Sequence, residues 1–343
     1  MIPEIGHFAL ILALAPVLTG CVRWLKARLM GRRGPHPLQA WRDVLKLLKK
    51  RPVLAENASA ISRAAPYMAL AAAVLAAALV PSFARGMVLA PFADLLLIAG
   101  LLALSRFAMA LAGMDVGTAF GGLGATREMA FAALAEPALV LVALIFAILA
   151  GTTNLDVITG IFQEGALGLR VSLGFAAVAL LAVAVAENAR IPVDNPATHL
   201  ELTMVHEAMI LEASGRHLAL WDFQASLRLT LWLALLAAAF LPFGMAAPGA
   251  GPIAWVIGLL VFMVKMAALG FALAVFESAI AKMRVFRVPE FLGAALLLGL
   301  QATRLQRGDR QRQARQPRED PPRLHTAHST RRSGSRIGTT RGG

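Results

Sequence analysis

The chain has 343 residues, of which 58% are hydrophobic and 15% are charged, and its mean hydropathy is +0.68. An ordinary soluble domain carries about a quarter charged residues and less apolar content, so this composition excludes that class. Apolar runs of about 18 residues or more recur, without the alternation that is typical of a transmembrane β-strand. The sequence therefore predicts an all-α, polytopic membrane protein.

The formal net charge of +13 arises mostly at one end of the chain. Residues 301–343 hold eleven arginines against three acidic residues, in a background of Gln, Pro, Gly and Ser. Segments of this composition bury too little apolar surface to fold, although they can touch RNA or anionic lipid. We predict a transmembrane helical domain over 1–302 and a disordered basic tail over 303–343.

Cofactor-binding motifs are missing from the sequence. Cys21 is the only cysteine, which leaves this chain no internal disulfide, no thiolate metal site and no iron–sulfur ligand set. There is no phosphate-binding glycine loop, and His206-Glu207 lacks the second histidine that a zinc motif needs four residues later. We therefore expect no cofactor and no metal bound by this chain itself.

The apolar runs predict about eight helices, of which the eighth is doubtful as a full span. In chain order the runs lie at about 5–24, 64–82, 91–113, 130–151, 171–188, 226–245, 252–276 and 289–302. After Pro289 only about 13 apolar residues follow, whereas a span needs about 20. We expect this last helix to be re-entrant or half-length, or the chain ending to be aberrant.

The basic residues of the loops predict the orientation of the helices. Cytoplasmic loops carry an excess of Lys and Arg, and residues 21–51 alone hold ten of them. The loops on the opposite side hold only Arg85 and Arg170. We predict that the N-terminus is outside and that the cytoplasmic loops are 21–63, 114–130 and 187–225.

Four charged residues lie inside or at the ends of predicted helices, namely Glu136, Lys265, Arg106 and Glu277. A charge at the bilayer centre costs at least about 2.5–3.5 kcal/mol, so its presence needs a reason. Arg106 and Glu277 lie near helix ends, where a long side chain can reach the interface. Glu136, followed by the helix-disturbing Pro137, and Lys265 lie deeper, either as a structural ion pair between helices or as groups that exchange protons.

Residues 187–212 gather five carboxylates between apolar helices, namely Glu187, Asp194, Glu201, Glu207 and Glu212. From Ala197 the pattern predicts a helix that ends at Gly215, with Glu201, Glu212 and Thr198 close to one face. Interleaved apolar residues indicate a covered helix rather than a solvated loop. Clustered carboxylates in such a place repel one another and retain protons, so we predict a proton reservoir or the mouth of a proton relay.

Four stretches, in order along the chain, resemble one protein family. They are GRRGPHPLQAWRDVLKLLKK, GGLGATREMAFAALAEP, AENARIPVDNPATHLELTMVHEAMILEASGRHLAL and FESAIAKMRVFRVPEFLG. They resemble the membrane subunit of group 4 nickel–iron hydrogenases, which includes the hydrogenase-4 component C and formate hydrogenlyase subunit 4 proteins. That family is similar to the H subunit (subunit 1) of respiratory NADH:quinone oxidoreductase, whose loop usually reads ETNR-x-P-F-D-x-P-E. The stretch ENARIPVDNPATHLE departs from that pattern, which favours the hydrogenase branch and weakens the case for quinone binding.

The resemblance implies a tilted eight-helix subunit, like subunit 1 of complex I, in the cytoplasmic membrane of a bacterium or archaeon. The implied partners are the hydrogenase large and small subunits, which would carry the nickel–iron centre and iron–sulfur clusters, an iron–sulfur electron-transfer subunit, and antiporter-like membrane subunits. By motif position it implies proton-transfer roles for Glu136, Glu187, Asp194, Glu201, Glu207, Glu212 and Lys265. It implies docking or structural roles for Arg190, Arg32, Arg33, Asp43, Arg106 and Glu277.

The resulting hypothesis is a subunit that performs no redox chemistry alone, anchors a hydrogenase and links electron transfer to proton movement. Three alternatives stay open. In the first, the chain is the quinone-binding subunit of a respiratory NADH:quinone oxidoreductase. In the second it is a stand-alone ion transporter, and in the third it is a passive membrane anchor whose buried charges are structural. The missing internal repeats and broken helix pairs argue against the transporter.

Overall fold

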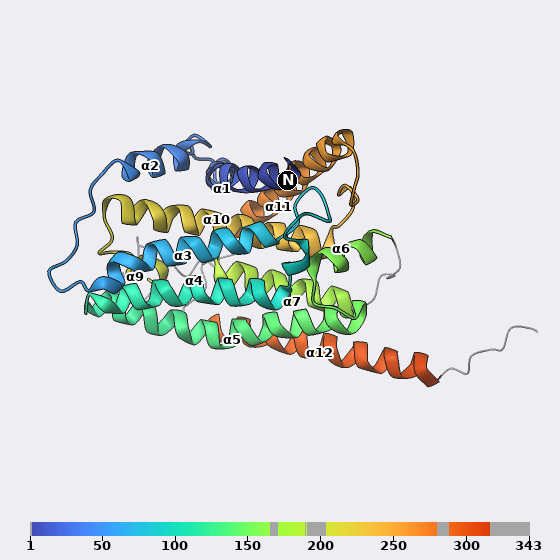
Figure 1. Ribbon diagram of the computed structural model, residues 1–343. Coiled ribbons are helices and arrows are strands. Elements are labelled where there is room, and N and C mark those ends of the chain that lie inside the picture. The colour runs from blue at the N-terminus through green and yellow to red at the C-terminus, as the bar shows by residue number, and fades with distance from the viewer. Residues whose placement is uncertain (1, 165–170, 189, 191–203, 280–287, 316–343) are drawn as a thin grey trace, which may run out of the picture.

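The computed structural model describes residues 2–164, 171–188, 190, 204–279 and 288–315, and these fold as an elongated bundle of α-helices (Figure 1). The elements are α1 (Ile2–Leu29), α2 (Gln39–Leu48), α3 (Ala60–Leu79), η1 (Ala90–Phe92), α4 (Leu95–Asp115), α5 (Ala119–Ala150), α6 (Leu155–Gln163), α7 (Val171–Glu187), α9 (His206–Met209), α10 (Gly215–Phe240), α11 (Pro252–Ala279) and α12 (Val288–Arg315). Within these ranges no β-strand occurs, only two isolated bridges. The all-α prediction is confirmed.

Six of the described helices are long and apolar enough to cross a membrane, namely α1, α3, α4, α5, α10 and α11. The α7 helix is equally apolar but has only 17 residues, or about 26 Å at 1.5 Å per residue. The central helix is α10, whose most apolar window is 83% buried inside the protein. A polytopic membrane fold is therefore confirmed, with α10 as the helix around which the others pack.

The two ends of the bundle are built differently. One end, called here the α9 end, contains α9, the adjoining ends of α4, α5, α7 and α10, and the peripheral helix α2 (Figure 1). The opposite end, called the α6 end, contains α6, the start of α1, and the loops 80–94 and 241–251. There the backbone of Phe83 and Arg85 bonds to Ala246. Short loops therefore close the α6 end.

The α5 helix begins earlier than the sequence predicted. It starts at Ala119, capped by the Thr118 hydroxyl, which accepts a hydrogen bond from the Gly121 amide, so most of the predicted loop 114–130 is helical. Its glycines serve close packing rather than a flexible turn: a Cβ on Gly121 would lie 2.0 Å from the Gly113 carbonyl oxygen, and one on Gly124 would lie 2.7 Å from that of Val205. Glu136 therefore lies mid-helix.

The segment before α10 also differs from the prediction. Of the helix expected from Ala197, residues 197–203 lie outside the described part, and only His206–Met209 are helical beyond it. Gly215 does not end a helix but begins α10, with φ of +53° and its α-carbon packed against the backbone of Arg51. The polar residues between Gly215 and Ser226 hid this start from an analysis based on apolar runs.

The α12 helix runs past the predicted end at residue 302, as far as Arg315. It packs along α5 and α7, where the Ser172 hydroxyl donates a hydrogen bond of 2.8 Å to the buried Gln306 side chain. Residues 303–315, predicted to belong to the disordered tail, are therefore helical, and at Gln306 the α7 helix supplies a polar partner. Residues 316–343 lie outside the described part of the chain.

Candidate functional site

Arg106 on α4 lies between two carboxylates. Its Nη1 donates to Oε1 of Glu187, the last residue of α7, and its Nη2 donates to Oε1 of Glu136 in α5. The side chain of Arg106 is only 4% exposed, and that of Glu187 is similarly buried, whereas that of Glu136 is 48% exposed. Arg106 therefore does not extend to the membrane interface, as its position near a helix end suggested, but joins three helices.

A second ionic cluster lies next to the first, at the α9 end. Arg228 of α10 is 2% exposed, and its Nη2 lies 2.6 Å from Nε2 of His206 on α9. The Nδ1 atom of His206 lies 3.5 Å from Oε2 of Glu128, a buried carboxylate of α5. Glu128 also interacts electrostatically with both Arg228 and Arg106, so the two clusters are coupled.

The contacts of His206 assign its protonation state. An arginine side chain is always protonated and can only donate, so Nε2 of His206 accepts and its proton resides on Nδ1, toward Glu128. Burial, followed by the positive charges of Arg228 and Arg106, lowers the pKa of His206 well below its ordinary value. The imidazole is therefore neutral at physiological pH, and its N–H is directed at a carboxylate.

Six side chains thus form what we call the buried charge chain, namely Glu128, His206, Arg228, Arg106, Glu187 and Glu136. It contains three carboxylates but only two permanent cations, since His206 is neutral. A buried charge is stable only when it is compensated, so the set is balanced when one carboxylate carries a proton. Such a set can hold one proton and transfer it among its members.

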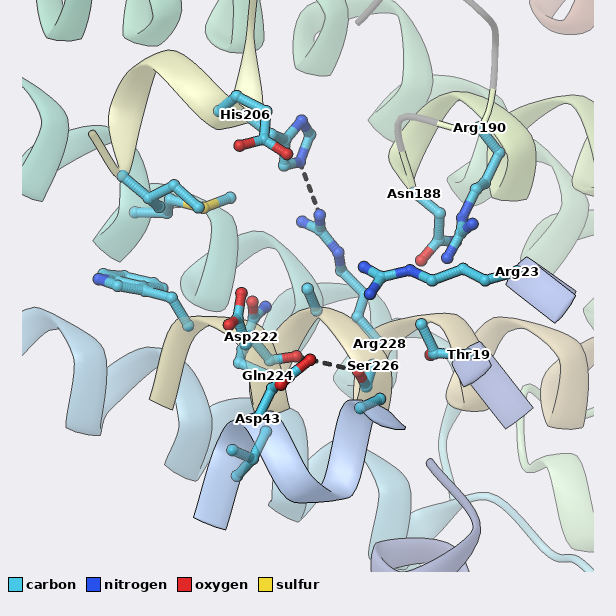
Figure 2. A pocket seen from close by; sticks show the side chains of 17 residues that line it. Thr19, Arg23, Asp43, Asn188, Arg190, His206, Asp222, Gln224, Ser226 and Arg228 are labelled. Atoms are coloured by element: carbon cyan, nitrogen blue, oxygen red, sulfur yellow. Dashed lines mark hydrogen bonds between the residues drawn. The ribbon is translucent and has the colours of Figure 1, made fainter. Parts of the chain in front are cut away.

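A polar cavity of about 280 Å³ adjoins the histidine end of the chain, between α1, α2, α9 and α10. His206 and Arg228 line it together with Asp43, Glu207 and Asp222 (Figure 2). A second cavity, of about 230 Å³ and with mostly apolar walls, surrounds the Arg106 end between α4 and α5. The buried charge chain therefore has a cavity at each end.

Of the seven residues predicted to transfer protons, Glu136 and Glu187 are members of the buried charge chain, whereas Asp194 and Glu201 lie outside the described residues. Glu207 is exposed and lines the polar cavity, and the exposed Glu212 lies on the other side of α9, away from that cavity. Lys265 is 6% exposed and donates a hydrogen bond of 2.5 Å to the carbonyl of Phe243, whose ring it also contacts. Among the described residues no carboxylate pairs with Lys265, so it and Glu136 form no ion pair.

The residues predicted to have docking or structural roles are spread over the α9 end. Glu277 accepts from Lys26 at 2.8 Å and from Arg190 at 3.3 Å, joining α1, α7 and α11. Asp43 of α2 accepts from Gln39, while Arg32 and Arg33 are exposed in the turn after α1. Only Arg106 of this group belongs to the buried charge chain.

Two members of the buried charge chain, Glu128 and Arg228, were not singled out from the sequence. Glu128 fell in a predicted loop because the glycines before it were interpreted as a turn. Arg228 fell at the edge of the predicted helix 226–245, where a basic residue is usually an interface anchor. Arg228 is the single charge in the otherwise apolar stretch SLRLTLWLALL, and Glu128, next to Arg127, directly precedes an apolar run; both signals become visible once the correct helix starts are known.

Metal binding has no basis in the described ranges, where no group of three or more His, Cys, Asp or Glu side chains lies close enough to hold an ion. Two acids of the buried charge chain, Glu187 and Glu136, each bind Arg106 through Oε1.

Comparison with known proteins identifies the family. A family model described as NADH dehydrogenase matches residues 4–303, nearly the whole of the helical bundle. The chain belongs to the NADH dehydrogenase subunit 1 family. As a member of this family with six candidate spans, it is a multi-pass membrane protein.

Within the NADH dehydrogenase subunit 1 family, the chain is similar to two proteins of Escherichia coli K12. It is 34% identical to hydrogenase-4 component C over 71% of this chain and 76% of that protein. It is 31% identical to formate hydrogenlyase subunit 4 over 82% of this chain and 91% of that protein. The predicted resemblance to these hydrogenase proteins is confirmed.

Two further comparisons agree with this family. NADH-quinone oxidoreductase subunit 8 of Rhodothermus marinus is 31% identical over 55% of this chain and 58% of its own length. A chain of the archaeal membrane-bound sulfane sulfur reductase superimposes with a TM-score of 0.74 at 19% identity, covering 89% of this chain and 98% of that one. This structural likeness confirms the fold.

Proposed function

We propose that this chain is the membrane-anchoring and proton-coupling subunit of a multi-subunit, energy-converting hydrogenase. The names of its two E. coli relatives support the hydrogenase part of the proposal. The observation that carries the coupling part is the buried charge chain, in which three carboxylates share two arginines between a polar and an apolar cavity.

The proposed proton movement follows from the contacts within the buried charge chain. For a proton from the polar cavity to reach Glu128, the Arg228 guanidinium first releases Nε2 of His206; Nε2 then takes up the proton, and Nδ1 gives its own proton to Glu128, so that the ring ends neutral. With the proton on Glu128, Arg228 and Arg106 are balanced by Glu187 and Glu136. Transfer of that proton from Glu128 to Glu187 and then to Glu136 keeps one proton on the three carboxylates. Glu136, whose side chain is half exposed on α5, is the residue from which a proton leaves the buried charge chain.

The same geometry suggests where the partners bind. We place the hydrogenase large and small subunits and the iron–sulfur electron-transfer subunit at the α9 end, because residues 21–63 and 187–225 contain 13 of the 22 basic residues that precede residue 301. An antiporter-like membrane subunit then covers the face of α4 and α5 that carries Glu136. This arrangement requires the N-terminus outside the cytoplasmic membrane of a bacterium or archaeon. The metal centres belong to the partners in this proposal.

Two measurements test the proposal separately. Extraction in mild detergent and mass spectrometry of the co-purifying proteins should yield a nickel–iron large subunit and an iron–sulfur small subunit. In inverted membrane vesicles, Glu128→Gln, Glu187→Gln and Glu136→Gln should each reduce H2-linked proton translocation to below about a tenth while dye-linked hydrogenase activity remains. Glu56→Gln, on an exposed turn, is the matched control. Intact translocation in all three variants would refute the relay, and absence of hydrogenase subunits would refute the assignment.

A quinone-binding role is a second candidate, which the polar cavity supports. Arg228 lines this cavity, and its Nε and Nη1 atoms have no hydrogen-bond partner among the described residues. Such donors suit the carbonyl oxygen of a quinone head. This role predicts NADH-oxidising flavoprotein subunits among the co-purifying proteins, and loss of activity with quinone-site inhibitors.

A further inference from the structure

A groove with apolar walls runs along α7, α10 and α11, separate from the buried charge chain. It has a volume of about 280 Å³, and each helix contributes four residues at positions i, i+3, i+4 and i+7, starting at Leu181, Leu229 and Leu269. That spacing is one continuous stripe per helix, about two turns or 10.5 Å long. Buried residues of α10 form the floor, while Leu181 and Ala272 at the rims are exposed. The groove is therefore a straight channel parallel to the helices.

One end of this groove is polar and the other is not. Asn188 and Arg190 lie at the end nearest the α9 end of the bundle, and both also line the polar cavity (Figure 2). The remaining residues of the groove are apolar. A ligand that fits must therefore be amphiphilic, with its head at Arg190 and its tail along the groove.

The charges at the polar end favour an anionic head. Arg190 and Lys26 share a single carboxylate, that of Glu277, and Arg23 lies close enough to Arg190 to repel it. Arg190 is the one charged side chain among the described residues that line the groove, whereas the acids Asp43, Glu207 and Asp222 line only the neighbouring polar cavity. The guanidinium of Arg190 retains further N–H donors for an anionic group at this end.

The dimensions of the groove favour an acyl chain over a helix from another subunit. An α-helix with side chains is about 10–12 Å across and would contact this groove over only about two turns. A single hydrocarbon chain is far narrower and gains stability from every methylene group that it buries. The bilayer that surrounds α7 and α11 supplies such chains directly.

We propose that this groove is a specific site for an anionic phospholipid, of the phosphatidylglycerol or cardiolipin class. One acyl chain lies between α7 and α11 on the floor of α10, and the phosphate is held by Arg190 with Arg23 beside it. The lipid fills the gap between two spans that contact each other mainly through α10. It also closes the side of the polar cavity at Asn188 and Arg190.

The test uses the complex that contains the full-length protein, reconstituted in phosphatidylcholine nanodiscs. The probe is phosphatidylglycerol with a spin label on its acyl chain. The wild type should immobilise a single phosphatidylglycerol molecule per chain, and spin-labelled phosphatidylcholine should not replace it. Ala272→Trp fills the groove and should abolish this immobilised signal. Ala267→Trp, an exposed position on the same helix outside the groove, should retain it.

The head-group contact is tested separately by Arg190→Gln, which leaves the 2.8 Å pair of Lys26 and Glu277 in place. This variant should bind phosphatidylglycerol and phosphatidylcholine equally. If the Ala272→Trp complex does not assemble, the Arg190→Gln result alone decides the proposal. Equal binding of both lipids by the wild type would overturn the proposal. So would retention of the signal in Ala272→Trp, or displacement of the probe by a co-purified quinone.

Discussion

Two groups of charged side chains in the bundle have different kinds of partner. Between the α9 end and the middle of α5, the members of the buried charge chain contact one another, side chain to side chain. At the α6 end, Glu4 accepts from the amides of Val88 and Leu89 at 2.6 and 3.1 Å, and Asp156 accepts from that of Gly86 at 3.1 Å. Lys265 likewise bonds to a backbone carbonyl of the 241–251 loop.

This difference separates groups that can exchange protons from groups that close the structure. A backbone amide neither releases nor accepts a proton in the physiological range, so it cannot relay one to or from a carboxylate that it binds. Carboxylates that share arginines can redistribute a proton among themselves. We therefore expect changes at the α9 end to affect proton coupling, and changes at the α6 end to affect stability alone.

Removal of the central cation should have the largest effect. Arg106→Met leaves Glu187 and Glu136 facing each other without compensation, and loss of one partner of a buried pair costs about 3–5 kcal/mol. Thermal denaturation of the purified complex should show a large decrease in melting temperature. Adding Glu187→Gln in the same chain should recover part of the loss, and a melting temperature equal to wild type in the single variant would contradict the role given to Arg106.

A cap at the α6 end should affect stability but not coupling. Asp94 accepts from the Leu96 amide at 2.7 Å at the start of α4, and loss of such a cap costs about 1 kcal/mol. Asp94→Ala should lower the melting temperature modestly while leaving H2-linked proton translocation unchanged. Asp94→Ser, which retains a capping oxygen, should restore most of the stability. Lost translocation in either variant would break the separation between the two ends.

Lys265 tests the comparison directly, because the sequence predicted it to transfer protons. Lys265→Met removes one hydrogen bond to the Phe243 carbonyl but also a buried charge, and these effects oppose each other. We expect a change in stability below about 1 kcal/mol and unchanged translocation. Strong loss of translocation would instead assign Lys265 to the relay.

The smallest effect is the pH dependence contributed by His206. Its folded-state pKa lies well below the ordinary value of about 6.5, so the unfolded chain binds a proton that the folded chain does not. This stabilising contribution is present above pH of about 6.5 and is lost as the pH falls below it. His206→Gln should therefore reduce the decrease in melting temperature between neutral and mildly acidic pH. An unchanged pH profile would indicate that the pKa of His206 does not differ between the folded and the unfolded chain.

Much of the fold was accessible from the sequence, because apolar runs report directly on helices in a membrane. Glu136 and Arg106 were singled out for the same reason, since each is a lone charge within such a run, and Glu187 was singled out as the first of the clustered carboxylates that follow one. The starts of α5 and α10 were not accessible, because Gly121, Gly124 and the polar residues after Gly215 are typical of loops unless their packing is known.

The connections within the site could not be derived from spacing along the chain. Arg106 and Glu187 are 81 residues apart, and Arg228 and His206 lie on different elements 22 residues apart. Which charges meet depends on how α4, α5, α7 and α10 pack together. The sequence placed Glu136 opposite Lys265 as a possible pair, whereas the packing gives Glu136 to Arg106.

The central claim is that three carboxylates in the buried charge chain share one proton. Infrared difference spectra of the H2-reduced and oxidised complex measure it directly, through the C=O stretching band of a protonated carboxyl group. We predict this band in the wild type and its loss in each of Glu128→Gln, Glu187→Gln and Glu136→Gln, because two carboxylates then balance two arginines without a proton. A band that persists unchanged in all three variants would contradict the claim.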